Sequence, residues 1–218
     1  MKRIFFSVLT LLVSAMANAA SESVDLRSLH HIKFDKIDAN EVMLSGDELR
    51  ISVDSSASFM MLGFEEVQTV TGVNLLWRSE GQPALRDAEH ERSKDGDDAV
   101  LKMALLLEGE YRGIDWFLPD WVEEARSRMH HESDELFYVV AASSNAPGEN
   151  WGNPYNDNIL MMPMQQSSAA EGRTLSSLRF DEPLRVVGIW LMADGDNTGS
   201  SFETFVYDIS FDNALKED

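Results

Sequence analysis

Short runs with a two-residue period recur along most of this chain. Residues 49–54 (LRISVD) alternate apolar and polar side chains strictly, and residues 73–78 (VNLLWR) follow the same period. Successive side chains of a β-strand point to opposite faces of the sheet, so this pattern is typical of strands with one buried face. Such strands must bury their apolar faces against each other, which favours stacked or closed sheets.

Other runs are apolar almost throughout and favour central strands that are covered on both faces. They are "DDAVLKMALLLEG", "ELFYVVAAS", "NDNILMMPM" and "LRVVGIWLM", followed by the alternating "FETFVYDISF". Together the runs predict roughly eight to ten strands separated by turn residues. We therefore expect an all-β fold, with the strands arranged as an antiparallel β-sandwich.

Two segments depart from the strand pattern. Residues 82–98 are highly charged and aperiodic, which predicts a loop or a short helix. The run "PDWVEEARSRMHH" predicts one short amphipathic helix, because Pro119 suits its start and Glu124 can pair with Arg128 one turn later. No linker or internal repeat divides the chain, so residues 20–218 are expected to form a single domain.

The first 19 residues have the composition of a secretory signal peptide. Lys2 and Arg3 precede the apolar residues 4–13, and Ala17 and Ala19 are small residues at the positions read by signal peptidase. The apolar run is shorter than the about 20 residues that span a bilayer, and no later segment is more apolar. The sequence therefore predicts cleavage after Ala19 and a periplasmic or secreted protein without a membrane span.

The mature chain is strongly acidic. Without Lys2 and Arg3, the 18 basic side chains fall to 16 against 38 acidic ones, a formal charge of −22. Such a chain repels phosphate backbones and anionic lipids, which argues against nucleic acid and membrane surfaces as partners. It contains no cysteine, so its core must hold without disulfides, and converging carboxylates would attract divalent cations.

No catalytic residue can be assigned from the sequence. There is no cysteine and no G-x-S-x-G motif, and the histidine pairs 30–31 and 130–131 have the wrong spacing for metal ligands on one helix face. Acidic residues flank several apolar strands at Asp97, Asp98, Asp194, Asp196 and Glu203. A glycoside hydrolase that uses a carboxylate pair is therefore a less favoured alternative.

The loop "DGDNTG" is the most suggestive motif. It begins like an EF-hand, but Phe205 stands where the bidentate Glu is needed and strand patterns replace the flanking helices. Asp194 and Asp196 could hold a structural calcium ion, with a further carboxylate from Asp97, Asp98 or Asp208. The same residues also make an ordinary hairpin turn, since Asp, Asn and Gly favour turns and positive φ. Both interpretations stay open.

Several aromatic residues lie in or beside loops. Trp116, Trp151 and Tyr155 could stack on a sugar ring, with Asn197 of the acidic loop as a polar neighbour. Aromatic side chains also close the ends of sandwiches, and Trp77 and Trp190 lie in strand patterns that predict core positions. Convergence of Trp151, Tyr155 and the acidic loop on one surface would favour a binding site.

Three segments make the chain resemble the domain of unknown function 3047 family of exported bacterial proteins. They are "VNLLWRS" with the following "RSKDGDDAVLKMALLLEG", then "LFYVVAASSNAPGENWGNPY", and finally "VVGIWLMADGDNTGSSFETFVYDISF". The likeness spans roughly residues 30–212, and the segment "DWFLPDWVEEARSRMHHESDE" looks like an insertion. The resemblance implies an all-β, jelly-roll-like antiparallel sandwich similar to carbohydrate-binding modules, and no established activity.

These patterns together predict an exported, non-catalytic binding module for a glycan or another cell-envelope component, with calcium as the expected cofactor. The alternative is a structural or assembly protein that contacts another protein of the cell envelope.

Overall fold

The computed structural model describes residues 21–110 and 118–213, and this part of the protein is mostly β-structure. Its strands are β1 (Ser21–Ser23), β2 (His30–Lys33), β3 (Glu41–Ser45), β4 (Glu48–Asp54), β5 (Ala57–Glu80), β6 (Ala99–Glu108), β7 (Ser133–Val140), β8 (Trp151–Asn153), β9 (Asn156–Pro163), β10 (Gln165–Ser168), β11 (Thr174–Asp194) and β12 (Ser201–Asn213). Its helices are α1 (Ala88–Glu91) and α2 (Asp120–Ser127), with short 3-10 turns η1 (Leu26–Ser28), η2 (Lys94–Gly96) and η4 (Ala170–Gly172).

The 12 strands form one mixed sheet with the central order β3-β4-β12-β5-β11-β6-β7-β9-β8. Strands β1, β10 and β2 pair with β12, β11 and β5 respectively. Every pairing is antiparallel except β7 with β9, which is parallel, so the expectation of a purely antiparallel sheet is wrong at that position. The difference arises because the chain leaves β7 through a loop and the short β8 before it returns as β9.

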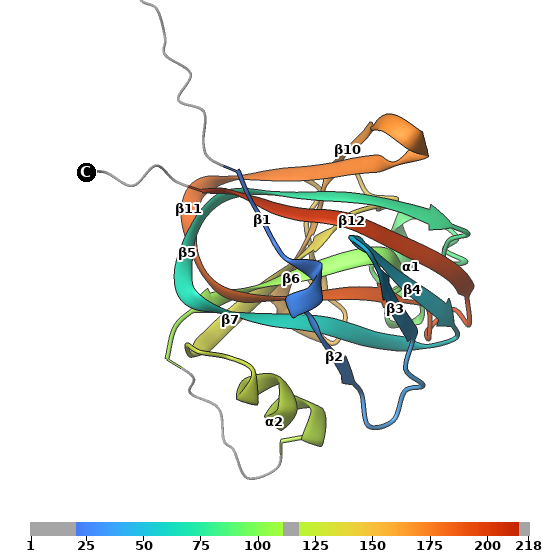
Figure 1. The fold of residues 1–218 in the computed structure, drawn as a ribbon. Coiled ribbons are helices and arrows are strands. Elements are labelled where there is room, and N and C mark those ends of the chain that lie inside the picture. The colour runs from blue at the N-terminus through green and yellow to red at the C-terminus, as the bar shows by residue number, and fades with distance from the viewer. Residues whose placement is uncertain (1–20, 111–117, 214–218) are drawn as a thin grey trace, which may run out of the picture.

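Strands β5 and β11 are much longer than the sequence runs suggest, and both bend sharply (Figure 1). Their pairing slips between Arg179 and Leu184 and again between Val186 and Gly188, which are the places where a bulge lets a strand turn. The first part of β5 pairs with β2 and the last part of β11, while its second part pairs with β12. The bend therefore folds the sheet over into two facing halves.

The main core lies between these two halves. It combines Ile51 and Leu75 from the β4-β12-β5 half with Met103 and Leu191 from the β6-β11 half, and each of these side chains is at most 2% exposed. Strand β6 is buried along most of its length, as its unbroken apolar run predicts. Packing of this kind replaces the disulfides that the chain lacks.

Helix α2 covers the outer face of the half that contains β6 and β7 (Figure 1). Pro119 occupies its N-cap position and Glu124 pairs with Arg128 at 3.9 Å, so the predicted helix is confirmed. The segment after it lies directly on Gly63 of β5, where a Cβ would come within 2.3 Å of the Arg128 carbonyl oxygen. The short α1 is a second helix in the charged segment 82–98, where a loop or a short helix was expected.

Neither helix in the described part of the chain has the length and apolar character needed to cross a membrane. The predicted signal peptide, residues 1–19, lies outside the described residues. Export and the single-domain boundary at residue 20 therefore stay predictions.

Candidate functional site

The two acidic segments of the sequence meet because β6 begins where its neighbour β11 ends. Asp194 is paired with Ala99 in the β6–β11 ladder and with Ala57 in the β5–β11 ladder. Asp97 and Asp98 immediately precede Ala99, and the Asp98 carboxylate reaches the loop that follows Asp194. This register brings together side chains that are almost 100 residues apart in the sequence.

The loop itself is not a hairpin, and that expectation is wrong. Strand β12 pairs with β4 and β5, whereas β11 pairs with β5 and β6, so residues 195–200 cross from one half of the sheet to the other. Turn chemistry still shapes the crossing, since Gly199 has a φ of +64° and the Ser200 amide donates to the Gly195 carbonyl at 2.9 Å. Asp, Asn and Gly suit a hairpin turn and a crossing loop equally well, so the sequence could not distinguish these two connections.

Asp98 holds the crossing loop in place. Its Oδ1 accepts from the Asn197 amide at 3.2 Å, and its Oδ2 accepts from the Thr198 amide at 2.8 Å and from the Thr198 hydroxyl. The side chain is only 2% exposed. These bonds satisfy the backbone amides of two half-buried loop residues.

Three carboxylates converge beneath the loop. Asp98, Asp194 and Asp196 each place an oxygen within 4.8 Å of the other two, and these are the residues that the sequence suggested for a cation. Glu203 instead pairs with Arg50, and Asp208 lies further along β12. The side chains of Asp98 and Asp194 are buried, whereas Asp196 is half-buried at the edge of the cluster.

Lys102 completes the cluster, and sequence reasoning missed it. Its Nζ lies 2.8 Å from Asp194 Oδ2 and 3.4 Å from Asp97 Oδ2, and it donates to the Asp97 carbonyl oxygen at 3.0 Å. The side chain is buried and its ammonium lies 5.7 Å from the centre of the Tyr138 ring. The signal in the sequence is a single lysine inside the apolar run "VLKMALLL", since a lysine is almost never fully buried without a charged partner.

Burial dominates the electrostatics of the cluster. It raises the pKa of Asp194 to about 6, because the Lys102 ammonium only partly offsets the loss of water and the Asp196 carboxylate adds to the rise. The pKa of Asp97 is also raised, again chiefly by burial. Burial alone would lower the pKa of Lys102, but the carboxylates of Asp194 and Asp97 outweigh it and raise that pKa.

The raised pKa of Asp194 means that a further positive charge nearby would stabilise its ionised form. An acid whose pKa is higher in the folded state loses stability as the pH rises from its unfolded value of 3.8 through about 6. Asp194 Oδ1 is buried and has no hydrogen-bond partner among the described residues. Hard oxygen donors of this kind are the ligands that Ca²⁺ prefers, so the residues present fit such an ion.

Tyr155 lies beside the loop, and the residue is 59% exposed. Its hydroxyl donates to Asn197 Oδ1 at 2.7 Å and also lies 3.2 Å from the Lys94 carbonyl oxygen. The ammonium of Lys94 is 5.4 Å from the ring centre. Two of the predicted binding residues, Tyr155 and Asn197, are therefore in direct contact at the acidic loop.

The other predicted aromatic residues are placed differently. Trp151 is only 8% exposed, and the Arg92 guanidinium lies 5.8 Å from its ring centre, so this ring is buried and not a surface for stacking. Trp116 lies outside the described residues. Trp77 is buried as expected, whereas Trp190 is half-buried on the outer face of the sheet.

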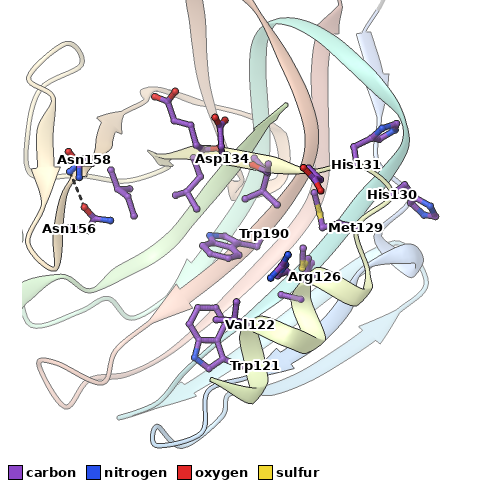
Figure 2. A pocket seen from close by; sticks show the side chains of 18 residues that line it. Trp121, Val122, Arg126, Met129, His130, His131, Asp134, Asn156, Asn158 and Trp190 are labelled. Atoms are coloured by element: carbon purple, nitrogen blue, oxygen red, sulfur yellow. Dashed lines mark hydrogen bonds between the residues drawn. The ribbon is translucent and has the colours of Figure 1, made fainter. Parts of the chain in front are cut away.

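Trp190 lines a separate cavity of about 640 Å³ between α2 and this outer face, here called the α2 cavity (Figure 2). Figure 2 shows Trp121 and Trp190 close together on the side of the helix, and their ring centres are 6.3 Å apart. Buried Met61 and Leu106 form part of the apolar lining, and Asp134, Asn156 and Asn158 supply polar groups. The volume lies within the usual range for small-molecule sites, so the cavity is a second place where a ligand could fit.

The carboxylate cluster has little of the geometry of a glycosidase. Catalytic carboxyl groups in those enzymes stand roughly 5–10 Å apart across a cleft that admits the sugar. Here the three ligand oxygens lie within 4.8 Å of one another, and both oxygens of Asp98 accept hydrogen bonds from the loop. The arrangement is better suited to holding a positive charge than to donating and accepting protons.

These features define a mostly-β protein with a buried acidic cluster, built around a lysine, at one end of a folded-over sheet. The family described as a protein of unknown function, domain of unknown function 3047, matches residues 29–210, and the chain belongs to that family. The resemblance carried by the three sequence segments is thus confirmed. A search of the curated proteins found no match.

Proposed function

We propose that this protein is an exported binding module for a glycan or another cell-envelope component, with calcium as a structural cation. The observation that carries the proposal is the contact between the exposed Tyr155 ring and the acidic loop through Asn197. An exposed ring that is held in one orientation offers a flat apolar face at low entropic cost. The half-buried Asp196 carboxylate and Asn197 amide beside it provide polar groups that sugar hydroxyls can bind.

The proposed architecture is the jelly-roll-like sandwich of carbohydrate-binding modules. The folded-over sheet and its shared core support it, although fold-level analogy alone does not assign a ligand. The proposed compartment is the periplasm or the exterior of the cell. The strongly acidic composition favours the binding of divalent cations and argues against nucleic acid as a partner.

We expect Tyr155→Ala to weaken glycan binding by about fivefold, because loss of one stacked ring removes on the order of 1 kcal/mol. The measurement is a glycan array, followed by pull-down with cell-envelope polysaccharides and titration of the best ligand. Tyr155→Phe is the matched control, since it keeps the ring and removes only the bonds to Asn197 and Lys94. It should retain most of the binding.

Two results would contradict this assignment. An array and a pull-down that are both blank would remove glycan binding altogether. Binding that survives Tyr155→Ala but is lost in Trp190→Ala would move the ligand site to the α2 cavity.

Calcium should stabilise the wild-type protein. An ion present at 100 times its Kd adds about 2.7 kcal/mol, which corresponds to a rise in Tm of roughly 5–10 °C for a domain of this size. The measurement is thermal melting in EDTA and after addition of calcium, with magnesium as the comparison ion. An identical Tm in EDTA and in calcium would leave the acidic loop as a turn only.

One observation favours the assembly alternative. The edge strand β3 pairs only with β4 among the described residues, and its Met43 and Leu44 are 60% and 40% exposed. An unpaired edge with apolar side chains can accept a strand from another protein. Co-purification with a stoichiometric partner, lost on Met43→Lys, would favour this function over glycan binding.

A further inference from the structure

Lys102 is the one described lysine that is buried, and it lies inside the most acidic part of the protein. Asp97 and Asp194 contact its ammonium, and the carboxylates of Asp98 and Asp196 converge with that of Asp194. With every group ionised, the cluster has a formal charge of −3, from four carboxylates and one ammonium. The Lys102 ammonium thus neutralises part of the carboxylate charge that a bound metal ion would otherwise neutralise.

The ammonium is held from two sides. On one side, Asp97 accepts through its carbonyl oxygen at 3.0 Å and faces the ammonium with its carboxylate at 3.4 Å. On the other side, Asp194 Oδ2 lies 2.8 Å away, which is the shortest of these contacts. The Asp97 carbonyl would hold Lys102 in place even if Asp194 turned toward another positive charge.

Asp194 is the residue that both cations would share. Its Oδ2 contacts Lys102, while its buried Oδ1 has no hydrogen-bond partner among the described residues, and Asp196 lies beside it. Asp98 differs, because both of its oxygens already accept hydrogen bonds from the crossing loop. The charge available to an added ion therefore comes mainly from Asp194 and Asp196.

We propose that Lys102 is a tethered counter-cation that competes with a divalent metal ion for Asp194 and so sets the affinity of the site. This inference rests on the cation site of the proposed function. Without metal, the ammonium partly neutralises the buried carboxylates and the fold persists. With metal, the ion takes a larger share of Asp194, and repulsion from the nearby ammonium keeps its binding weak.

The consequence is a site adjusted to high calcium concentrations. Extracellular calcium modules have a Kd of about 10⁻⁴–10⁻³ M, and a buried positive charge next to the ligands places this site in that range. A protein that encounters changing calcium levels outside the cytoplasm would stay folded at low calcium and gain rigidity in the loop at high calcium. The loop carries Asn197, so the contact with Tyr155 would respond to the ion.

The test is a calorimetric titration of the purified protein with calcium alone, together with melting in EDTA and in calcium. Lys102→Met keeps a side chain of similar length and removes the charge. We expect it to bind calcium at least about tenfold more tightly than the wild type, to melt at a lower temperature in EDTA, and to recover in calcium. Lys94→Met is the matched control, because it removes a lysine that is exposed near the same site, and its affinity should stay within about twofold.

A double variant keeps the test decisive if Lys102→Met fails to fold. Lys102→Met/Asp97→Asn removes one charge of each sign, so the cluster remains at −3 while Asp194 loses its competing ammonium. Competition for Asp194 predicts tighter calcium binding than in the wild type. An unchanged affinity would mean that only the net charge matters and would overturn the proposal.

The remaining outcomes are also separable. Binding that is equal or weaker in Lys102→Met than in the wild type, or no binding in any variant, would overturn the role of Lys102. Binding in the lysine variants but not in the wild type would support the role of Lys102 as the resident cation and refute calcium as a natural cofactor. Glycan binding is measured separately, so its absence would refute the proposed ligand without affecting the calcium titration.

Discussion

Asp194→Ala should lower the free energy of unfolding by about 3 kcal/mol in EDTA and should abolish any gain from calcium. The variant removes the closest partner of the buried Lys102 ammonium, and breaking a buried ion pair costs about 3–5 kcal/mol because one charge remains uncompensated. We expect the lower end of that range, since Asp97 still contacts the ammonium and repulsion among the carboxylates is relieved. Urea denaturation at constant pH measures the change.

Asp196→Ala is the control, because it alters the same loop without touching Lys102. Asp196 is half-buried, and its carboxylate accepts a hydrogen bond from the side chain of its neighbour Asn197. It should cost less than about 1 kcal/mol in EDTA and still remove the gain in Tm from calcium. Equal losses in the two variants in EDTA would show that the Lys102–Asp194 pair contributes little to the fold.

Gly63→Ala should destabilise the protein by about 2–3 kcal/mol and loosen α2 from the sheet. A Cβ at this position would lie 2.3 Å from the Arg128 carbonyl oxygen and 2.9 Å from the Met129 Cα. Both are backbone atoms, so a side-chain rotation cannot relieve the overlap and the helix end must move. Such a movement would alter the α2 cavity, which Met129, Trp121 and Trp190 line.

Tryptophan fluorescence and urea denaturation together measure this effect, since Trp121 and Trp190 line the same cavity as Met129. Gly152→Ala is the matched control, as its nearest neighbours stand 3.3 Å away and belong to the exposed Asp157. It should cost less than about 1 kcal/mol. A Gly63→Ala variant with the stability and emission spectrum of the control would mean that α2 is only loosely seated.

The alternating runs predicted the strands well because the period of a strand is a local property. Residues 49–54 lie in β4, and residues 73–78 lie in the second part of β5. What local pattern could not indicate is that residues 57–80 form one continuous strand. The bend that divides β5 between two halves of the sheet depends on the register with β11, and that register is set by partners distant in the sequence.

The candidate site was predicted in its composition and not in its arrangement. Asp98, Asp194 and Asp196 were named from their flanking positions, and the structure brings them within 4.8 Å because β6 begins beside the end of β11. Lys102 escaped notice because a lysine in an apolar run has no partner visible in sequence. Trp151 and Tyr155 lie four residues apart in similar surroundings, yet one is buried and the other exposed, and only the tertiary packing separates them.

The sequence by itself determined a mostly-β fold, one amphipathic helix, a glycine-containing acidic loop and membership of a family, since each of these depends on local periodicity, turn chemistry or motif order. The tertiary structure alone decided that the loop crosses between the two halves of the sheet and that the buried Lys102 pairs with Asp97 and Asp194 of the acidic cluster. Strand pairing depends on the burial of distant apolar faces, and a lysine can remain charged in a core only where folding brings carboxylates to it.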